Sequence, residues 1–215
     1  MKELYIVNLF DLEKTIARPL FEEKLYPWEI LCPLEEFIKE LISTLDPEIY
    51  DIENDIAIAK SAKLAKNVTI TPPCIIGERS ELRTGAFIRG SVIVGRECVV
   101  GNSCEIKNSV LFDRVQVPHF NYVGDSVLGF GAHLGAGAVT SNVKLDKKKI
   151  SICGIETHRR KVGAMLGDGV EVGCNAVLNP GTVVGKNTII YPLSMTRGYV
   201  PENLIFKGRE IVWRE

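Results

Sequence analysis

Residues 86–107, AFIRGSVIVGRECVVGNSCEIK, decide the fold of this chain. Within them an aliphatic residue returns at every sixth position, as Ile88, Val94, Val100 and Ile106. The residue two places before each of these is small or short: Ala86, Val92, Cys98 and Cys104. A six-residue unit with one large and one small inward position is typical of a β-helix, in which successive turns of the chain stack on one another. The stretch therefore predicts an all-β solenoid.

The same repeat extends well beyond this stretch. It begins upstream at Ile58, Leu64, Ile70, Ile76 and Leu82. After Ile106 the spacing alternates between five and six residues, and after a gap the repeat resumes at Leu166, Val172, Leu178, Val184 and Ile190. Three units make one triangular coil of about 18 residues, and parallel ladders place neighbouring coils about 4.8 Å apart. We therefore predict a parallel β-helix of hexapeptide repeats over residues 51–215, with Cys74, Cys98 and Cys104 in its core.

Residues 1–50 follow different rules. All 19 glycines lie at or after Gly77. The run PLEEFIKELISTL at 33–45 places apolar residues at helical spacing, and Pro33 suits a first helical position. We predict a small α-helical N-terminal cap at residues 1–50, and we hypothesise that its apolar stripe, from Leu34 to Leu45, packs on the open end of the solenoid.

Residues 143–163, VKLDKKKISICGIETHRRKVG, interrupt the repeat and form a basic inserted loop. Seven cations stand there against Asp146 and Glu156: Lys144, Lys147, Lys148, Lys149, Arg159, Arg160 and Lys161. A run of charge is usually a solvated loop. A long loop in a tightly wound solenoid is nevertheless often functional, so both interpretations stay open.

Composition excludes several classes of function. The formal net charge of −1 gives no overall footprint for nucleic acid or for an anionic membrane. No run approaches the roughly 18 apolar residues of a membrane span, and the N-terminus does not read as a signal peptide, so we expect a cytoplasmic protein. The chain has only three histidines, His119, His133 and His158, and no CxxC pair, so no metal site is expected.

Two cations occupy equivalent positions on successive coils. Arg89 follows Ile88, and Lys107 follows Ile106 three units later. Like charges stacked about 4.8 Å apart repel by about 1 kcal/mol in water, and a phosphate group is a natural counter-charge for Arg and Lys. The alternative is that both side chains extend separately into solvent.

His119 lies two residues after Val117, in a predicted column with Asn102 and Ala136. A neutral imidazole can accept a proton at cellular pH, although an isolated surface histidine often has no role. Several functional groups project from the same part of the solenoid, namely Glu105, Lys107, Tyr122 and Asn142. These neighbouring groups favour the interpretation of His119 as a general base.

The run VGNSCEIKNSVLFDRVQVPHFNYVGDSVLGFGAHLGAGAVTSN resembles a known family. It is similar to the acetyltransferase domain of the bifunctional N-acetylglucosamine-1-phosphate uridyltransferase/glucosamine-1-phosphate acetyltransferase, whose pattern is VGNxxEIK, HLxYxGD and GAGTITxN. The run THRRKVGAMLGDGVEVGCNAVLNPGTVVG resembles the archaeal sugar-1-phosphate nucleotidylyltransferase/acetyltransferases. The resemblance covers residues 75–210. It implies a left-handed coil, which the repeat alone cannot establish, and a homotrimer with its active site between subunits.

The resemblance also implies roles for individual residues. His119 would be the general base and Glu105 its polarising partner. The sugar phosphate and amino sugar would be held by Arg89, Lys107, Tyr122, Lys148 and Asn142. The coenzyme side would include the backbone N–H of Ala136 and the side chain of Arg209. The basic loop of one subunit would close over its neighbour.

Four departures from the family pattern lie on these two sides. His133 and Val143 stand on the acceptor side, where the family has asparagine and tyrosine. Cys174 and Pro192 stand in the coenzyme groove, where the family has serine and alanine. The identity of the acceptor sugar therefore stays open, and so does the use of acetyl-CoA as the donor.

The predicted activity is acyl-CoA-dependent N-acetylation of an amino-sugar phosphate or a nucleotide amino sugar, with acetyl-CoA as co-substrate. A nucleotidyltransferase is not expected from this chain, because no glycine precedes residue 77 to form a phosphate-cradling loop. The alternative is a non-catalytic trimeric β-helix protein that binds a sugar phosphate or nucleotide sugar, or that scaffolds a partner.

Overall fold

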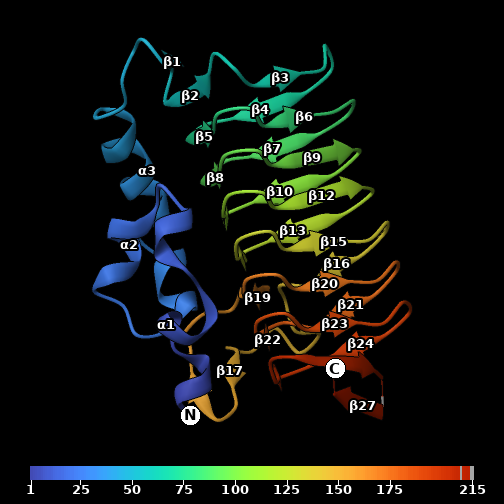
Figure 1. The fold of residues 1–215 in the computed structure, drawn as a ribbon. Helices are drawn as coiled ribbons and strands as arrows, with labels where there is room; N and C mark the ends of the chain where they lie inside the picture. The colour runs from blue at the N-terminus through green and yellow to red at the C-terminus, as the bar shows by residue number, and fades with distance from the viewer. Residues whose placement is uncertain (209, 214–215) are drawn as a thin grey trace.

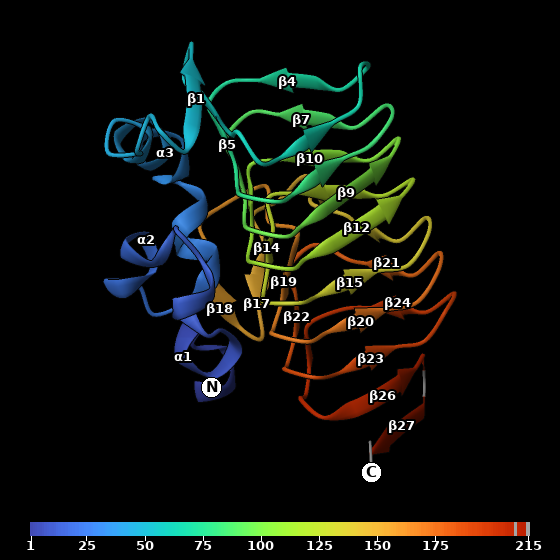
Figure 2. The same ribbon diagram turned by 45° about the horizontal axis from the view of Figure 1, so that its top comes forward.

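The computed structural model describes residues 1–208 and 210–213. The chain winds into a three-sided solenoid whose strands run parallel from coil to coil, and a helical segment lies along one side of it (Figures 1 and 2). The solenoid is a left-handed parallel β-helix, so the predicted fold class is confirmed. No helix in the described part of the chain is long and apolar enough to cross a membrane.

Three sheets form the sides of the solenoid. Sheet I contains β1 (Tyr50–Glu53), β2 (Ile56–Ala59), β5 (Cys74–Ile76), β8 (Val92–Val94), β11 (Ser109–Leu111), β14 (Val127–Leu128), β19 (Ala164–Leu166), β22 (Thr182–Val184) and β25 (Tyr199–Val200). Sheet II contains β3 (Lys63–Leu64), β6 (Glu81–Leu82), β9 (Val99–Asn102), β12 (Gln116–His119), β15 (His133–Leu134), β20 (Glu171–Val172), β23 (Ile189–Ile190), β26 (Leu204–Lys207) and β27 (Glu210–Trp213). Sheet III contains β4 (Thr69–Thr71), β7 (Phe87–Arg89), β10 (Glu105–Lys107), β13 (Tyr122–Gly124), β16 (Val139–Thr140), β21 (Val177–Leu178) and β24 (Met195–Thr196).

The sequence repeat is the inward column of each sheet. In the ladders, Ile76 pairs with Val94, Leu82 with Val100, and Ile88 with Ile106. These side chains are at most 1% exposed. The small inward positions are filled as expected, because Cys74, Cys98 and Cys104 are buried free thiols. Each coil therefore contributes one layer to a continuous apolar core.

The helical segment consists of short elements joined by turns. Its elements are η1 (Lys2–Leu4), α1 (Ile6–Leu9), η2 (Leu12–Lys14), α2 (Arg18–Glu22), η3 (Pro27–Leu31) and α3 (Leu34–Ile42). The segment begins beside the C-terminal coils and runs along the solenoid toward its first coil (Figures 1 and 2). Helix α3 contacts β5 and β8 of sheet I. The hypothesis that its apolar stripe covers the open end of the solenoid is therefore wrong.

Sheet I is covered because its outer face is apolar. The central residues of its strands point away from the solenoid core, yet each is 0% exposed: Ala57, Ile75, Ile93, Val110, Val127, Met165 and Val183. Burying such a column beneath helices is more favourable than exposing it to water. Main-chain hydrogen bonds fix the segment in place, from Asp168 N–H to Leu9 O at 3.0 Å and from Asp113 N–H to Lys14 O at 2.9 Å.

The basic inserted loop divides into two parts. Residues 145–149 are exposed, whereas β17 (Ser151–Ile152) and β18 (Ile155–Glu156) form an antiparallel hairpin. Ile150 and Ile152 are each 1% exposed and lie against Gly181 of the same chain. The hairpin lies beside the N-terminal turns (Figures 1 and 2). Its apolar residues therefore hold the hairpin on its own solenoid and leave residues 145–149 exposed.

Candidate active site

The corner between sheets II and III brings four predicted site residues into one line. His119 ends β12 and pairs with Asn102 of the coil before. The Gly137 N–H donates to His119 O at 3.0 Å, Asn175 N–H to Ala136 O at 2.9 Å, and Leu193 N–H to Cys174 O at 3.0 Å. These bonds stack the corner residues coil upon coil, about 4.8 Å apart. The stacked predicted residues are His119, Ala136, Cys174 and Pro192.

His119 is held by its backbone, and among the described residues its ring has no hydrogen-bond partner. Its N–H donates to the side-chain oxygen of Asn121 at 3.0 Å. Asn121 is 3% exposed and donates in turn to the carbonyls of Gly135 and Ala138. The His119 side chain is exposed, so an acceptor can reach the imidazole. Asn121 is a positioning residue that sequence reasoning missed, although it lies within the quoted motif.

The backbone N–H of Ala136, unlike that of His119, has no hydrogen-bond acceptor among the described residues. Ala136 is half-buried at the corner one coil below His119. A fixed backbone donor without an internal partner suits a developing negative charge on oxygen. Arg209, the last predicted coenzyme residue, lies outside the described residues.

A buried carboxylate holds several of the residues that are predicted to bind the acceptor. Asp125 is 2% exposed, and its oxygens accept from Asn142 Nδ2 at 2.6 Å and from Asn108 Nδ2 at 2.7 Å. The Lys107 ammonium lies 3.6 Å from the same carboxylate. The Gly163 N–H donates to Asp125 O at 2.7 Å, which ties down the end of the inserted loop. Asp125 belongs to the quoted motif, but no role had been predicted for it.

Tyr122 joins this cluster through its hydroxyl. Asn142 Nδ2 lies 3.1 Å from Tyr122 Oη. Burial raises the pKa of the Tyr122 phenol, and the nearby Asp125 carboxylate adds to the effect. The ring has room because Gly124 has no side chain: a Cβ there would collide with the Tyr122 hydroxyl. The phenol is therefore a neutral hydrogen-bonding group at the edge of the site.

Glu105 lies elsewhere than the resemblance implies. Its carboxylate accepts from Arg89 Nη1 at 2.7 Å, and within the described chain no hydrogen bond joins it to His119. The reason is positional, because Glu105 and Arg89 project from adjacent strands of sheet III, whereas His119 lies at the corner of sheet II. Attraction between opposite charges then favours the Arg89 pair.

The two stacked cations are also compensated within the chain. Arg89 is paired with Glu105, and Lys107 with Asp125. Their mutual repulsion therefore does not by itself require a bound phosphate, which corrects the charge argument made from the sequence. Both cations nevertheless line a cavity of about 460 Å³, at the corner between sheets III and I.

Two predicted substrate residues stand apart from this cluster. His133 pairs through Nδ1 with Glu171 Oε2 at 2.8 Å on the outer face of sheet II. Lys148 is exposed in the inserted loop, and its N–H donates to Asp146 at 3.0 Å. The described chain thus brings together Arg89, Lys107, Tyr122 and Asn142, but not His133 or Lys148.

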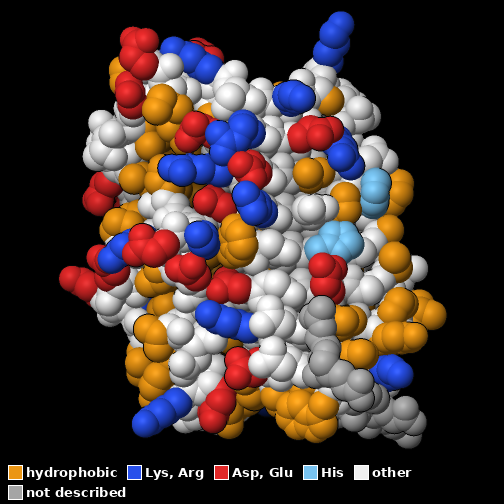
Figure 3. Space-filling model, in the orientation of Figure 1, with side chains coloured by type: hydrophobic (Ala, Val, Ile, Leu, Met, Phe, Trp, Pro, Cys, Tyr) orange, Lys and Arg blue, Asp and Glu red, His pale blue; other side chains and the backbone are white. Residues whose placement is uncertain are grey.

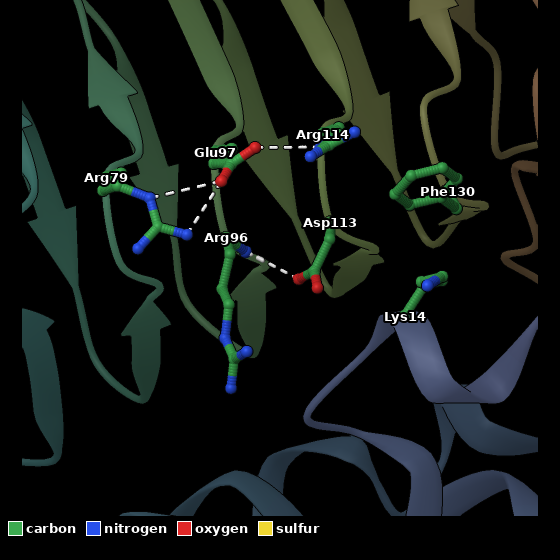
Figure 4. Close-up of a pocket in the computed structure, with 7 residues that line it drawn as sticks. All are labelled: Lys14, Arg79, Arg96, Glu97, Asp113, Arg114 and Phe130. Carbon is green, nitrogen blue, oxygen red and sulfur yellow. Dashed lines mark hydrogen bonds and ion pairs between the residues drawn. The ribbon is translucent and has the colours of Figure 1, made fainter.

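A second concavity, of about 220 Å³, is a lattice of ion pairs (Figure 4). Glu97 pairs with Arg79 and with Arg114, each at 2.8 Å, across three successive coils. Arg96 pairs with Glu78 at 3.5 Å. The surface view shows basic and acidic side chains interleaved over this face (Figure 3). Each arginine of this concavity has a carboxylate partner, which is typical of a structural ladder. Among the described residues no group of side chains is placed to hold a metal ion.

Two curated proteins are similar to most of this chain. A bifunctional protein GlmU of Methanococcus maripaludis is 31% identical over 194 residues, covering 87% of this chain and 47% of the relative. A bifunctional sugar-1-phosphate nucleotidylyltransferase/acetyltransferase of Sulfurisphaera tokodaii is 32% identical over 185 residues, covering 76% of this chain and 46% of the relative. The chain thus spans about half the length of the curated relatives it matches.

Solved structures give a weaker likeness. PerB from Caulobacter crescentus, in complex with CoA and GDP-perosamine, has 19% identity and a TM-score of 0.35, covering 69% of this chain and 52% of that one. The acetyltransferase domain of PglB from Neisseria gonorrhoeae, in complex with acetyl coenzyme A, has 14% identity and a TM-score of 0.33, covering 78% and 72%.

The family model described as the GMPPB C-terminal domain matches residues 70–189. The match includes Asp125 and the corner residues from Asn102 to Cys174, but not Pro192. It leaves the helical segment outside. The repeat, the solenoid and this match agree, and the chain belongs to the family of the GMPPB C-terminal domain.

Proposed function

We propose that this protein is an acyl-CoA-dependent N-acetyltransferase that acts on an amino-sugar phosphate or a nucleotide amino sugar, with acetyl-CoA as co-substrate. The observation that carries the proposal is the line of His119 and Ala136 at the corner of sheets II and III, with the polar cluster of Asp125 across sheet III from it. The names of the relatives, which include a sugar-1-phosphate acetyltransferase, support the same chemistry.

The first step is removal of a proton. An amino sugar is mostly an ammonium at neutral pH, so its nitrogen needs a base before it attacks the thioester carbonyl carbon. The exposed His119 imidazole takes that proton. As the C–N bond forms, the carbonyl oxygen becomes an oxyanion, and the Ala136 N–H donates to it. The C–S bond then breaks, and the nitrogen, positively charged since its attack, gives its second proton to the departing sulfur by way of solvent. Coenzyme A leaves as the thiol, the acetyl group stays on nitrogen as an amide, and His119 releases the first proton to solvent.

The polar cluster holds the acceptor in this proposal. Arg89 and Lys107 bind the phosphate, and Tyr122 and Asn142 contact the sugar near its amine. Cys174 and Pro192 line the path of the coenzyme below Ala136. In a homotrimer, Lys148 and His133 of this chain would contribute to the active site of an adjacent subunit. We also propose that the protein is cytoplasmic.

Acetyl transfer is expected when acetyl-CoA is mixed with a panel of amino-sugar phosphates and nucleotide amino sugars. The measurement is chromatographic separation of free coenzyme A, because the protein has exposed thiols of its own, including Cys153 and Cys174. Glucose 1-phosphate, which lacks the amine, is the matched control and should release none. Equal release with glucose 1-phosphate would show simple hydrolysis and would contradict the proposal.

Coenzyme binding at the corner is expected to protect Cys174 from alkylation. Cys174 is exposed there, and Cys153 is exposed on the β17–β18 hairpin, where no coenzyme is proposed. Peptide mass mapping after brief iodoacetamide treatment, with and without coenzyme A, measures both rates. The proposal predicts slower modification of Cys174 alone. Equal rates at Cys174 with and without coenzyme would place the coenzyme elsewhere.

A homotrimer is expected in solution. Several apolar side chains are exposed on the corner and outer faces of the lower coils: Phe120, Val177, Tyr191, Leu193 and Met195. Exposed apolar side chains of this kind favour association. Sedimentation velocity measures the mass. Leu193 is 80% exposed, and we expect it to contribute to the contact between subunits, so Leu193→Asp should yield smaller species. Val7 in α1 is 73% exposed, and Val7→Asp should leave the trimer intact. A monomeric wild-type protein would contradict the trimer.

One observation favours the alternative of a non-catalytic trimeric β-helix protein that binds a sugar phosphate. The carboxylate expected to polarise His119 is instead paired with Arg89. Binding of sugar phosphate without any coenzyme binding would support this alternative. Binding of both ligands with release of coenzyme A would support the enzyme.

A further inference from the structure

The cavity of about 460 Å³ at the corner between sheets III and I is built by three separate parts of the chain. The solenoid contributes Arg89, Lys107 and Asn108. The helical segment contributes Leu31 and the first turn of α3, including Glu35. The segment that follows the β17–β18 hairpin contributes Arg159. The helical segment therefore forms one wall of a cavity that also contains two proposed phosphate ligands.

Arg159 differs from the other charged residues of this cavity. Arg89 and Lys107 have carboxylate partners in the solenoid, and Glu35 accepts from Lys39 at 3.1 Å. Among the residues that the structure describes, no carboxylate pairs with Arg159.

The guanidinium of Arg159 is held but not satisfied. Its Nη2 donates to Leu31 O at 3.5 Å, a long hydrogen bond. Its Nε is buried and has no hydrogen-bond partner among the described residues. A buried donor on a charged group that lacks a partner is costly. An anionic ligand in the cavity, which Arg159 lines, would supply the counter-charge that no described carboxylate provides.

We propose that Arg159 binds the phosphate monoester of the acceptor, and that the Leu31 carbonyl positions its guanidinium for this contact. The inference deepens the proposed function and rests on it, because it identifies the ligand of the cavity as the phosphate of the same substrate. It adds a residue of the inserted loop and a wall of the helical segment to the site. Guanidinium and phosphate are complementary, since two parallel N–H groups can donate to two oxygens.

The test is calorimetric titration of the full chain with inorganic phosphate and with glucosamine 1-phosphate, without coenzyme. Arg159→Gln is expected to weaken both affinities about tenfold or more, because it removes a charged hydrogen bond. Arg160→Gln removes the neighbouring charge from an exposed position and should bind as the wild type does. Arg159→Lys, which keeps the charge but not the planar fork, should fall between them.

Equal losses in Arg159→Gln and Arg160→Gln would show a general effect of charge and would overturn the inference. So would unchanged affinity in Arg159→Gln, or no binding of either ligand by the wild type. Melting curves establish that each variant folds. If Arg159→Gln does not fold, the affinity of Arg159→Lys is compared with that of the wild type instead.

These outcomes are separate from those for acetyl transfer. Arg159-dependent phosphate binding without coenzyme A release would support this site and reject the enzyme. Acetyl transfer with an acceptor KM that is unchanged in Arg159→Gln would support the enzyme and reject the phosphate site at Arg159. If both hold, Arg159→Gln should raise the KM for the sugar phosphate and leave the KM for acetyl-CoA unchanged.

Discussion

Replacing His119 by asparagine is expected to lower kcat for acetyl transfer about 100- to 10,000-fold, the usual contribution of a general base. The imidazole is exposed at the corner of sheets II and III, and its backbone is held by Asn121. Asparagine can keep that backbone contact but cannot take the proton from the ammonium. The measurement is steady-state release of coenzyme A with the preferred acceptor, and binding of both ligands should persist.

His158→Asn is the matched control. His158 is an exposed histidine of the inserted loop, with a backbone φ of +58° that asparagine tolerates. Its activity should equal that of the wild type. A His119→Asn protein that keeps full kcat would show that the base lies elsewhere. His133, which does have a carboxylate partner in Glu171, would then be tested next.

Replacing Asp125 by alanine is expected to lower the free energy of unfolding by about 2–4 kcal/mol. The buried carboxylate accepts from Asn108 and Asn142 and compensates Lys107. Its removal leaves two amides and an ammonium without their partner in a nearly closed environment. Urea denaturation followed by circular dichroism measures the change.

Acceptor binding should weaken in the same variant, because Asn142 and Lys107 lose the group that positions them. Asp51→Ala serves as the control, since Asp51 is an exposed carboxylate of β1. Its unfolding midpoint should stay within experimental scatter. Equal midpoints for Asp125→Ala and the wild type would mean that the cluster contributes little to stability.

The fold could be predicted from the sequence because the repeat has a physical cause. Each coil must present a large and a small residue inward, so Ile88 and Ile106 stack directly in the ladder. The same regular stacking made the corner line predictable, since positions one coil apart in sequence lie one above another in space. Asn102, His119 and Ala136 therefore stack as expected, and Cys174 joins them although the inserted loop interrupts the repeat before it.

The placement of the helical segment could not be predicted in the same way. Periodicity showed that α3 has an apolar stripe but not which surface receives it. The missing signal lay between the inward residues, at Ile75, Ile93 and Val110, where an outward position is apolar on coil after coil. Such a column indicates a covered side rather than a covered end.

The charge partners were also beyond the sequence. A carboxylate such as Glu105 has several cations within reach, and only the positions of the side chains decide which one it meets. Asp125 and Asn121 lay within the recognised motif, but their roles depend on burial and on hydrogen bonds to distant residues. Arg159 reaches the cavity between sheets III and I from an inserted loop whose path the repeat does not specify.

The central claim is that an amine of a phosphorylated sugar receives an acetyl group at the His119 corner. Its most direct test is mass spectrometry of glucosamine 1-phosphate and related amino-sugar phosphates after incubation with the protein and acetyl-CoA. We predict a product heavier by one acetyl group, located on nitrogen, with its phosphate intact. Recovery of every acceptor unchanged, with acetyl-CoA intact, would contradict the account.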